Sequence, residues 1–116
     1  MTPNTAITYL YRDASNYKYR ETVVVAGPVR FADLQPFLDA DAGDGNGFCP
    51  VDVGLPHPGV QGEGWPNEDD HCWCELAEDD FEPTDLAPTH GSATALIEKF
   101  KKAHAAGWPA QFREPE

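Results

Sequence analysis

Proline and glycine recur through the middle of the chain, over residues 48–66, and they restrict where regular helices and strands can form. We expect this segment to be extended or irregular. Four apolar side chains are expected to hold it to the core: Phe48, Val51, Val53 and Leu55. The longer regular elements are therefore expected on either side of it.

Two runs of β-branched and aromatic residues near the start predict an antiparallel hairpin. The first run covers residues 6–12 and the second covers residues 17–26. Residues 13–16 join them with Asp, Ser and Asn side chains, which bond the nearby backbone in turns. Gly27 and Pro28 are expected to end the second strand.

Two later segments predict helices. Asp33 is placed to cap a short helix that runs to about residue 40, with Leu34, Phe37 and Leu38 on one face. Ser92 is placed to cap a longer helix, and Gly107 provides its left-handed stop. The apolar stripe of this longer helix has the 3.6-residue spacing and consists of Ala93, Leu96, Ile97, Phe100 and Ala103.

Residues 70–77 predict a third strand, because their alternation puts Cys72, Cys74 and Leu76 on one face. Three cysteines in a chain without a secretory N-terminal pattern favour free, buried thiols over a disulfide framework. Residues 81–90 contain Pro83 and Pro88 and are expected to form a loop.

The length of 116 residues fits one compact domain, which we expect to span residues 1–116 with a frayed tail after about residue 109. The predicted elements define an α+β fold. We expect a small antiparallel sheet of about three strands, packed with one or two helices and carrying a long middle loop rich in proline and glycine.

The charges are unevenly distributed along the chain. There are 20 acidic and 8 basic side chains, for a formal net charge of −12, and no Lys or Arg lies between Phe31 and Glu98. The carboxylates are densest from Glu63 to Asp85, where mutual repulsion opposes folding. One interpretation is a solvated acidic surface that aids solubility. The other is a surface that docks a cationic partner, and in its sharper form imitates the closely spaced charges of DNA.

Composition also excludes some classes of partner. A broad basic face is missing, so we expect no direct binding of nucleic acid. No apolar run approaches the roughly 18 residues of a membrane span, so we expect no membrane association. The N-terminus has no signal pattern, and we expect a cytoplasmic protein.

The expected partner-binding surface combines carboxylates with one aromatic side chain. An exposed Trp73 ringed by carboxylates suits an Arg-rich partner, through cation–π contact and charge-assisted hydrogen bonds. The alternative is that Trp73 packs under the proline-rich loop or a helix. The expected site residues are Glu68, Asp69, Asp70, His71, Trp73, Glu75, Glu78, Asp79, Asp80 and Glu82.

The sequence carries no strong signature of catalysis or metal binding. The nucleophile-elbow, phosphate-loop and dinucleotide motifs are missing, and Cys72 and Cys74 are spaced too tightly for a usual zinc pair. A Cys49–His57 pair is the thiol alternative. We expect no catalytic residues, no metal and no cofactor.

Three segments carry a family resemblance: residues 11–18 (Y-R-D-A-S-N-Y-K), residues 53–56 (V-G-L-P) and residues 69–75 (D-D-H-x-W-x-E). Over roughly residues 6–85 the chain resembles a group of small bacterial and phage-associated proteins without an assigned activity. The resemblance implies no catalytic residues. By type only, as a small acidic chain without enzyme motifs, it is similar to anti-CRISPR inhibitors.

These observations predict a non-enzymatic binding or inhibitor protein. Its partner is expected to be a basic protein, and in the sharper form a nucleic-acid-binding protein whose site it blocks. The first alternative is an immunity protein to a basic toxin. The second alternative is a small metal- or thiol-dependent enzyme.

Overall fold

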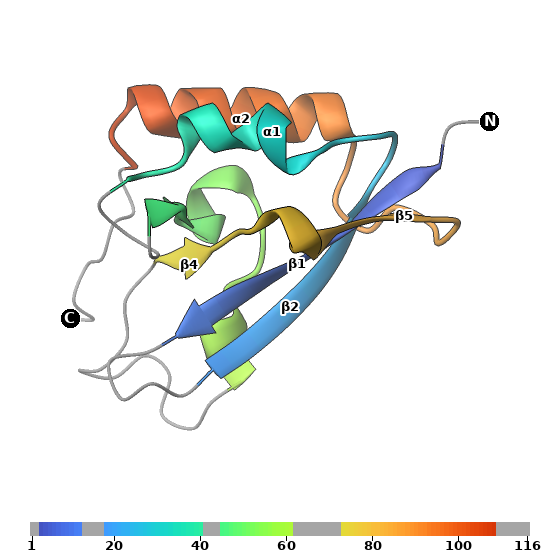
Figure 1. Ribbon diagram of the computed structural model, residues 1–116, viewed down its shortest axis with the longest axis horizontal. Helices are drawn as coiled ribbons and strands as arrows, with labels where there is room; N and C mark the ends of the chain where they lie inside the picture. Colours follow the sequence, from blue (N-terminus) through green and yellow to red (C-terminus); the bar gives the residue numbers. More distant parts are fainter. Residues whose placement is uncertain (1–2, 13–17, 41–44, 62–72, 109–116) are drawn as a thin grey trace.

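The computed structural model describes residues 3–12, 18–40, 45–61 and 73–108. Two helices lie next to one another along one side of a five-stranded, antiparallel sheet (Figure 1). The predicted α+β class is confirmed, with more strands than the three expected. No helix among these residues is long and apolar enough to cross a membrane.

The predicted hairpin is confirmed. Strand β1 (Asn4–Arg12) pairs antiparallel with β2 (Lys18–Val25), from Thr5 opposite Val25 to Arg12 opposite Lys18. Every second residue of β1 is buried, because successive side chains of a strand point to opposite faces of the sheet. The buried face of β1 consists of Thr5, Ile7, Tyr9 and Tyr11.

Two short strands share the other edge of β1. Strand β4 (Cys74–Glu75) pairs with β1 and, on its far side, with β3 (Gly47–Phe48). Strand β5 (Phe81–Thr84) pairs with the first residues of β1. Only Cys74–Glu75 of the predicted third strand is seen as a strand, and residues 70–72 lie outside the described residues.

The expectation of a loop over residues 81–90 is wrong for its first four residues, which form β5. Pro83 suggested a loop because proline cannot donate to a strand ladder. An edge strand tolerates it, since one side of such a strand needs no donor. Within the described residues, β5 pairs with β1 alone.

Helix α2 (Ala93–Ala105) follows the prediction closely. The Ser92 hydroxyl caps it by accepting a hydrogen bond from the Ala95 N–H at 3.1 Å. Gly107 adopts φ 78°, and the Trp108 N–H donates to the Ala103 carbonyl at 2.8 Å. The stripe predicted from spacing is buried at all positions except Ile97, which is half-buried.

Helix α1 (Phe31–Leu34) is shorter than predicted and continues as the single turn η1 (Gln35–Phe37). Asp33 lies inside the first turn instead of preceding it, and its carboxylate accepts the Arg30 N–H at 2.9 Å. The helix therefore starts two residues before Asp33 and ends before residue 40. On its predicted apolar face, Leu34 and Leu38 are buried and Phe37 is partly buried against the core.

The middle of the chain is irregular, as its proline and glycine content predicts, with the short 3₁₀ turns η3 (Pro50–Val53) and η4 (Pro58–Gln61). Phe48, Val53 and Leu55 are buried, whereas Val51 is 61 % exposed. The expectation that Val51 packs in the core is wrong, because the η3 turn directs it to solvent while its neighbours pack inward.

The centre of the core is aromatic. The Phe48, Phe100 and Trp108 rings lie 5.4 to 6.5 Å apart, mostly edge to face. This cluster joins β3, the middle of α2 and the residue after α2, so it fastens the longer helix to the sheet.

Candidate acidic docking site

The acidic segment after β4 forms a tight turn. Its residues η5 (Glu78–Asp80) lead directly into β5. The Asp80 carboxylate accepts the Ala77 N–H at 2.8 Å, and the Asp80 N–H donates to the Ala77 carbonyl at 3.0 Å. Four residue pairs with β1 then hold β5 in place. The carboxylates of this segment are therefore carried by a structured sheet edge.

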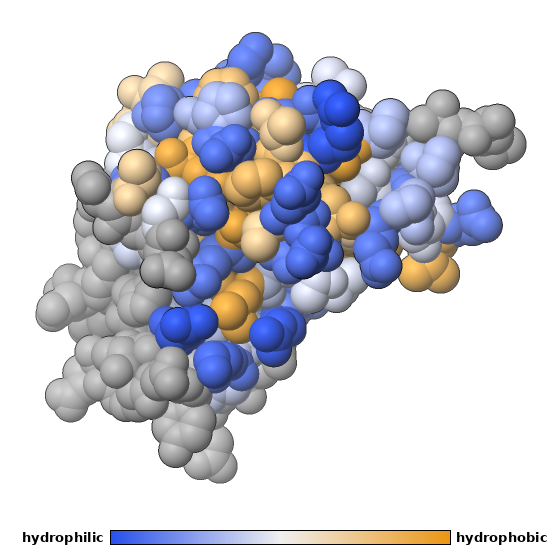
Figure 2. All heavy atoms as spheres, in the orientation of Figure 1, coloured by the Kyte–Doolittle hydropathy of each residue, from blue (hydrophilic) through white to orange (hydrophobic). Residues whose placement is uncertain are grey.

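Four carboxylates of this segment face solvent, and we call them the acidic edge: Glu78, Asp79, Glu82 and Asp85. None of them forms an ion pair within the described part of the chain, whose ion pairs involve other residues. Figure 2 shows hydrophilic side chains over η5 and along β5, with apolar ones between them and the helices. Asp85 was in the acidic run but outside the predicted site.

Two predicted site residues, Glu75 and Asp80, lie near arginines of the hairpin and are not part of the acidic edge. The Glu75 carboxylate is 3.9 Å from the Arg12 guanidinium. Asp80 is half-buried, and this burial raises the pKa of its carboxyl; the Ala77 N–H and Arg20 act in the opposite direction. Both carboxylates are thus partly neutralised by residues of the hairpin, and they contribute less to a free acidic surface.

Trp73 packs against the hydrophobic core. It is half-buried, and its ring lies 6.4 Å from the Trp108 ring in an edge-to-face arrangement. The alternative interpretation, in which Trp73 packs against the rest of the fold, describes it better. The other expected site residues lie outside the described residues: Glu68, Asp69, Asp70 and His71.

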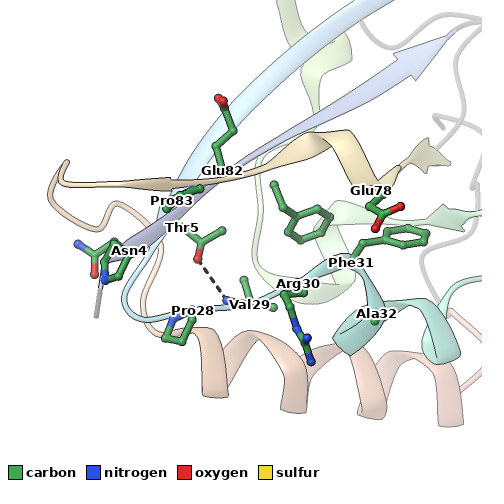
Figure 3. Close-up of a pocket in the computed structure, with 12 residues that line it drawn as sticks. Asn4, Thr5, Pro28, Val29, Arg30, Phe31, Ala32, Glu78, Glu82 and Pro83 are labelled. Atoms are coloured by element: carbon green, nitrogen blue, oxygen red, sulfur yellow. Dashed lines mark hydrogen bonds between the residues drawn. The ribbon is translucent and has the colours of Figure 1, made fainter. Parts of the chain in front are cut away.

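A cleft of about 360 Å³ lies beside the acidic edge, between β5, the start of β1 and the segment that leads into α1. Figure 3 shows Phe31 beside Glu78, and Arg30 directed away from β5. Thr5 fixes the wall opposite β5, because its hydroxyl accepts the Val29 N–H at 3.2 Å. No local pattern in the sequence predicts this cleft, because its walls come from three distant parts of the chain.

The cysteines differ from their predicted state. Cys49 is disulfide-bonded, so the expectation of a free thiol there is wrong, while Cys74 is free and buried as expected. The odd number of cysteines and the missing secretory pattern misled the prediction for Cys49, because neither shows which segments the pairing of β3 with β4 brings together.

His57 contacts Cys74, and the Cys49–His57 thiol alternative fails because Cys49 is disulfide-bonded. Its Nε2 lies 3.9 Å from the Cys74 Sγ, and its Nδ1 accepts the Gly59 N–H at 3.0 Å. Burial raises the pKa of the Cys74 thiol well above its ordinary value, and Glu75 adds to the effect. Reactive cysteines need the opposite shift and access to solvent, so this pair has the character of a structural contact.

Among residues 3–12, 18–40, 45–61 and 73–108, no three His, Cys, Asp or Glu side chains gather in a way that could hold a metal ion. No protein-family model, curated protein or solved structure matches the chain. The resemblance to small bacterial and phage-associated proteins therefore stays a prediction.

Proposed function

We propose that this chain is a non-enzymatic binding protein that docks a basic protein through its acidic edge. The supporting observation is that Glu78, Asp79 and Glu82 are exposed along η5 and β5 without a cationic partner in the described residues. The function is thus assigned to a surface and not to a catalytic pocket.

Repulsion within the acidic edge favours a cationic partner. Its carboxylates lie within eight residues of one another and repel, so the isolated protein carries an electrostatic cost there. Lysines or arginines of a partner would relieve this repulsion on binding. The formal net charge of −12 would also speed encounter with a basic surface, because complementary fields steer association.

The finer form of the proposal is that the partner is a nucleic-acid-binding protein. Such a protein already presents Lys and Arg at the spacing of phosphates, about 1.7 Å of helix axis per charge for duplex DNA. A row of exposed carboxylates on a sheet edge suits the same cations. The acidic edge would then compete with nucleic acid for the partner's binding site.

The test is affinity capture from a lysate of the source organism, with nuclease added to remove bridging nucleic acid. Wild-type protein is compared with the triple variant Glu78→Gln, Asp79→Asn, Glu82→Gln at low and high salt, about 0.05 and 0.5 M. We expect a basic protein to be captured by wild type at low salt only, and to be lost from the triple variant.

A matched control raises the net charge equally at another place. The control variant Glu98→Gln, Ala105→Lys, Ala106→Lys changes exposed positions in and after α2. It should capture the same partner as wild type. Capture that is indifferent to salt, or equal loss in both variants, would reject the acidic edge as the docking surface. Competition by duplex DNA for the captured protein then tests the finer form.

A further inference from the structure

We propose that the cleft beside the acidic edge takes a large apolar side chain of the partner, at a position where Lys or Arg residues flank that side chain. This inference rests on the proposed function and specifies the segment of the basic partner that is recognised. The cleft volume of about 360 Å³ is at the small end of binding pockets, so it suits one anchoring side chain.

The walls of the cleft are apolar and rigid. The Phe31 and Phe81 rings lie 6.2 Å apart at an angle of 65°, and Pro28 and Pro83 also line the space. Aromatic and proline side chains lose little conformational freedom when a ligand binds, so contact with them is gained at a small entropic cost.

Hydrogen bonds hold the two main walls at a fixed separation. The Thr5 hydroxyl, on β1, donates to the Gly27 carbonyl at 2.9 Å and accepts the Val29 N–H at 3.2 Å. Thr5 is also opposite Pro83 in the pairing of β1 with β5. One side chain thus connects both walls, and the cleft is formed before any ligand arrives.

The charges around the cleft favour a cationic occupant. Glu78 and Glu82 line it and form no ion pair within the described residues. The cation in the lining is Arg30, and its guanidinium lies 3.8 Å from the Asp33 carboxylate, which offsets its charge. A Lys or Arg next to the anchor would meet Glu78 and Glu82, and would approach the aromatic walls for cation–π contact.

A second copy of this chain is a poorer occupant. The large apolar side chains that are exposed in the described residues are Val51 and Leu86, at 61 % and 64 %. Each has an aspartate next to it in the sequence, Asp52 and Asp85. Either anchor would therefore bring negative charge toward Glu78 and Glu82, which opposes binding.

The inference is tested with three synthetic peptides titrated into ¹⁵N-labelled protein. The first is Gly-Lys-Lys-Phe-Lys-Lys-Gly, the second replaces its Phe by Ser, and the third replaces its lysines by glutamates. We expect saturable shifts of the Val29, Phe31 and Phe81 amide signals with the first peptide only. Equal affinity for the Phe and Ser peptides, or the absence of shifts at these amides, would overturn the inference.

A pair of variants tests the space itself. Ala32 is exposed on α1 and lines the cleft, so Ala32→Phe should fill it. Ala95, exposed on α2 and outside the lining, provides the control Ala95→Phe. We expect at least about tenfold weaker binding of the Phe peptide to Ala32→Phe and no change with Ala95→Phe. Unchanged affinity in Ala32→Phe would also contradict the inference.

The two proposals fail in different ways. If the lysate partner is captured through the acidic edge while the Phe and Ser peptides behave alike, the docking function stands and the cleft is not its anchor site. If the Phe peptide binds at the cleft while the triple variant captures as wild type does, the cleft is a binding site and the acidic edge is not the docking surface.

Discussion

Raising the pH from 8 to 10 should destabilise this protein through one buried thiol. Cys74 is fully buried beside His57, and burial, with a contribution from Glu75, raises the pKa of its thiol well above the ordinary value of 9.0. In the unfolded chain the thiol regains that ordinary value. Between pH 9 and the higher native pKa, the unfolded chain loses a proton that the native protein keeps, so stability falls as the pH rises.

The size of the effect follows from proton linkage. With an unfolded-state pKa of 9.0, thiolate formation stabilises the unfolded chain by RT ln 11 at pH 10, about 1.4 kcal/mol. At pH 8 the same contribution is below about 0.1 kcal/mol. Tyr9 adds to the fall in the same direction, because burial raises its pKa above the ordinary value of 10.0. At pH 10, ionisation of Tyr9 in the unfolded chain lowers the free energy of unfolding by about 0.4 kcal/mol.

The assay is urea unfolding followed by tryptophan fluorescence, at pH 8 and at pH 10, for wild type and Cys74→Ala. Loss of the buried thiol lowers stability at both pH values. The informative quantity is therefore the change in the free energy of unfolding between pH 8 and pH 10. We expect the free energy of unfolding to fall by about 1.4 kcal/mol more in wild type than in Cys74→Ala. Recovery of the native fluorescence on refolding checks that the Cys49 disulfide has not exchanged. An equal fall in both proteins would refute the reasoning.

Two further predictions concern the N-terminal cap of helix α2 and the turn that contains Asp80. Ser92→Ala removes the acceptor for the Ala95 N–H and should lower the free energy of unfolding by about 1 kcal/mol, while Ser92→Asn should stay within a few tenths of wild type in the same urea assay. At pH 7, Asp80→Asn should leave stability equal or higher, because burial raises the pKa of Asp80 and ionisation is therefore unfavourable in the folded state. Asp80→Ala should instead destabilise by about 1 kcal/mol, since the Ala77 N–H loses its acceptor. On acidification from pH 7 to pH 4, the difference in free energy of unfolding between wild type and Asp80→Asn should become smaller. An unchanged difference would contradict the raised pKa of Asp80.

Several elements were predictable because their signals lie close together in the chain. The hairpin needs only two β-branched runs and a turn, and helix α2 needs only Ser92, a 3.6-residue stripe and Gly107. Strand β5 was missed because its strand pairing depends on β1, about 75 residues earlier, and Pro83 suggested a loop. Strand β5 therefore forms because it pairs with β1, and its own residues do not indicate a strand.

The candidate site was only partly predictable for the same reason. The acidic run identified Glu78, Asp79 and Glu82, but the cleft beside them is built from residues near 4, 30 and 80, which no local pattern relates. The contact of His57 with Cys74 likewise spans 17 residues, and no local pattern in the sequence indicates it.

The amino-acid sequence by itself determined how much negative charge this protein carries and that its lysines and arginines are confined to the two ends of the chain. Only the tertiary structure decided which carboxylates remain unpaired. The hairpin lies next to β4 and η5, which brings Arg12 to Glu75 and Arg20 near Asp80 and leaves Glu78, Asp79 and Glu82 facing solvent. Ion pairing depends on distances of a few ångströms in space, and residues separated by sixty positions acquire such distances only when the chain folds.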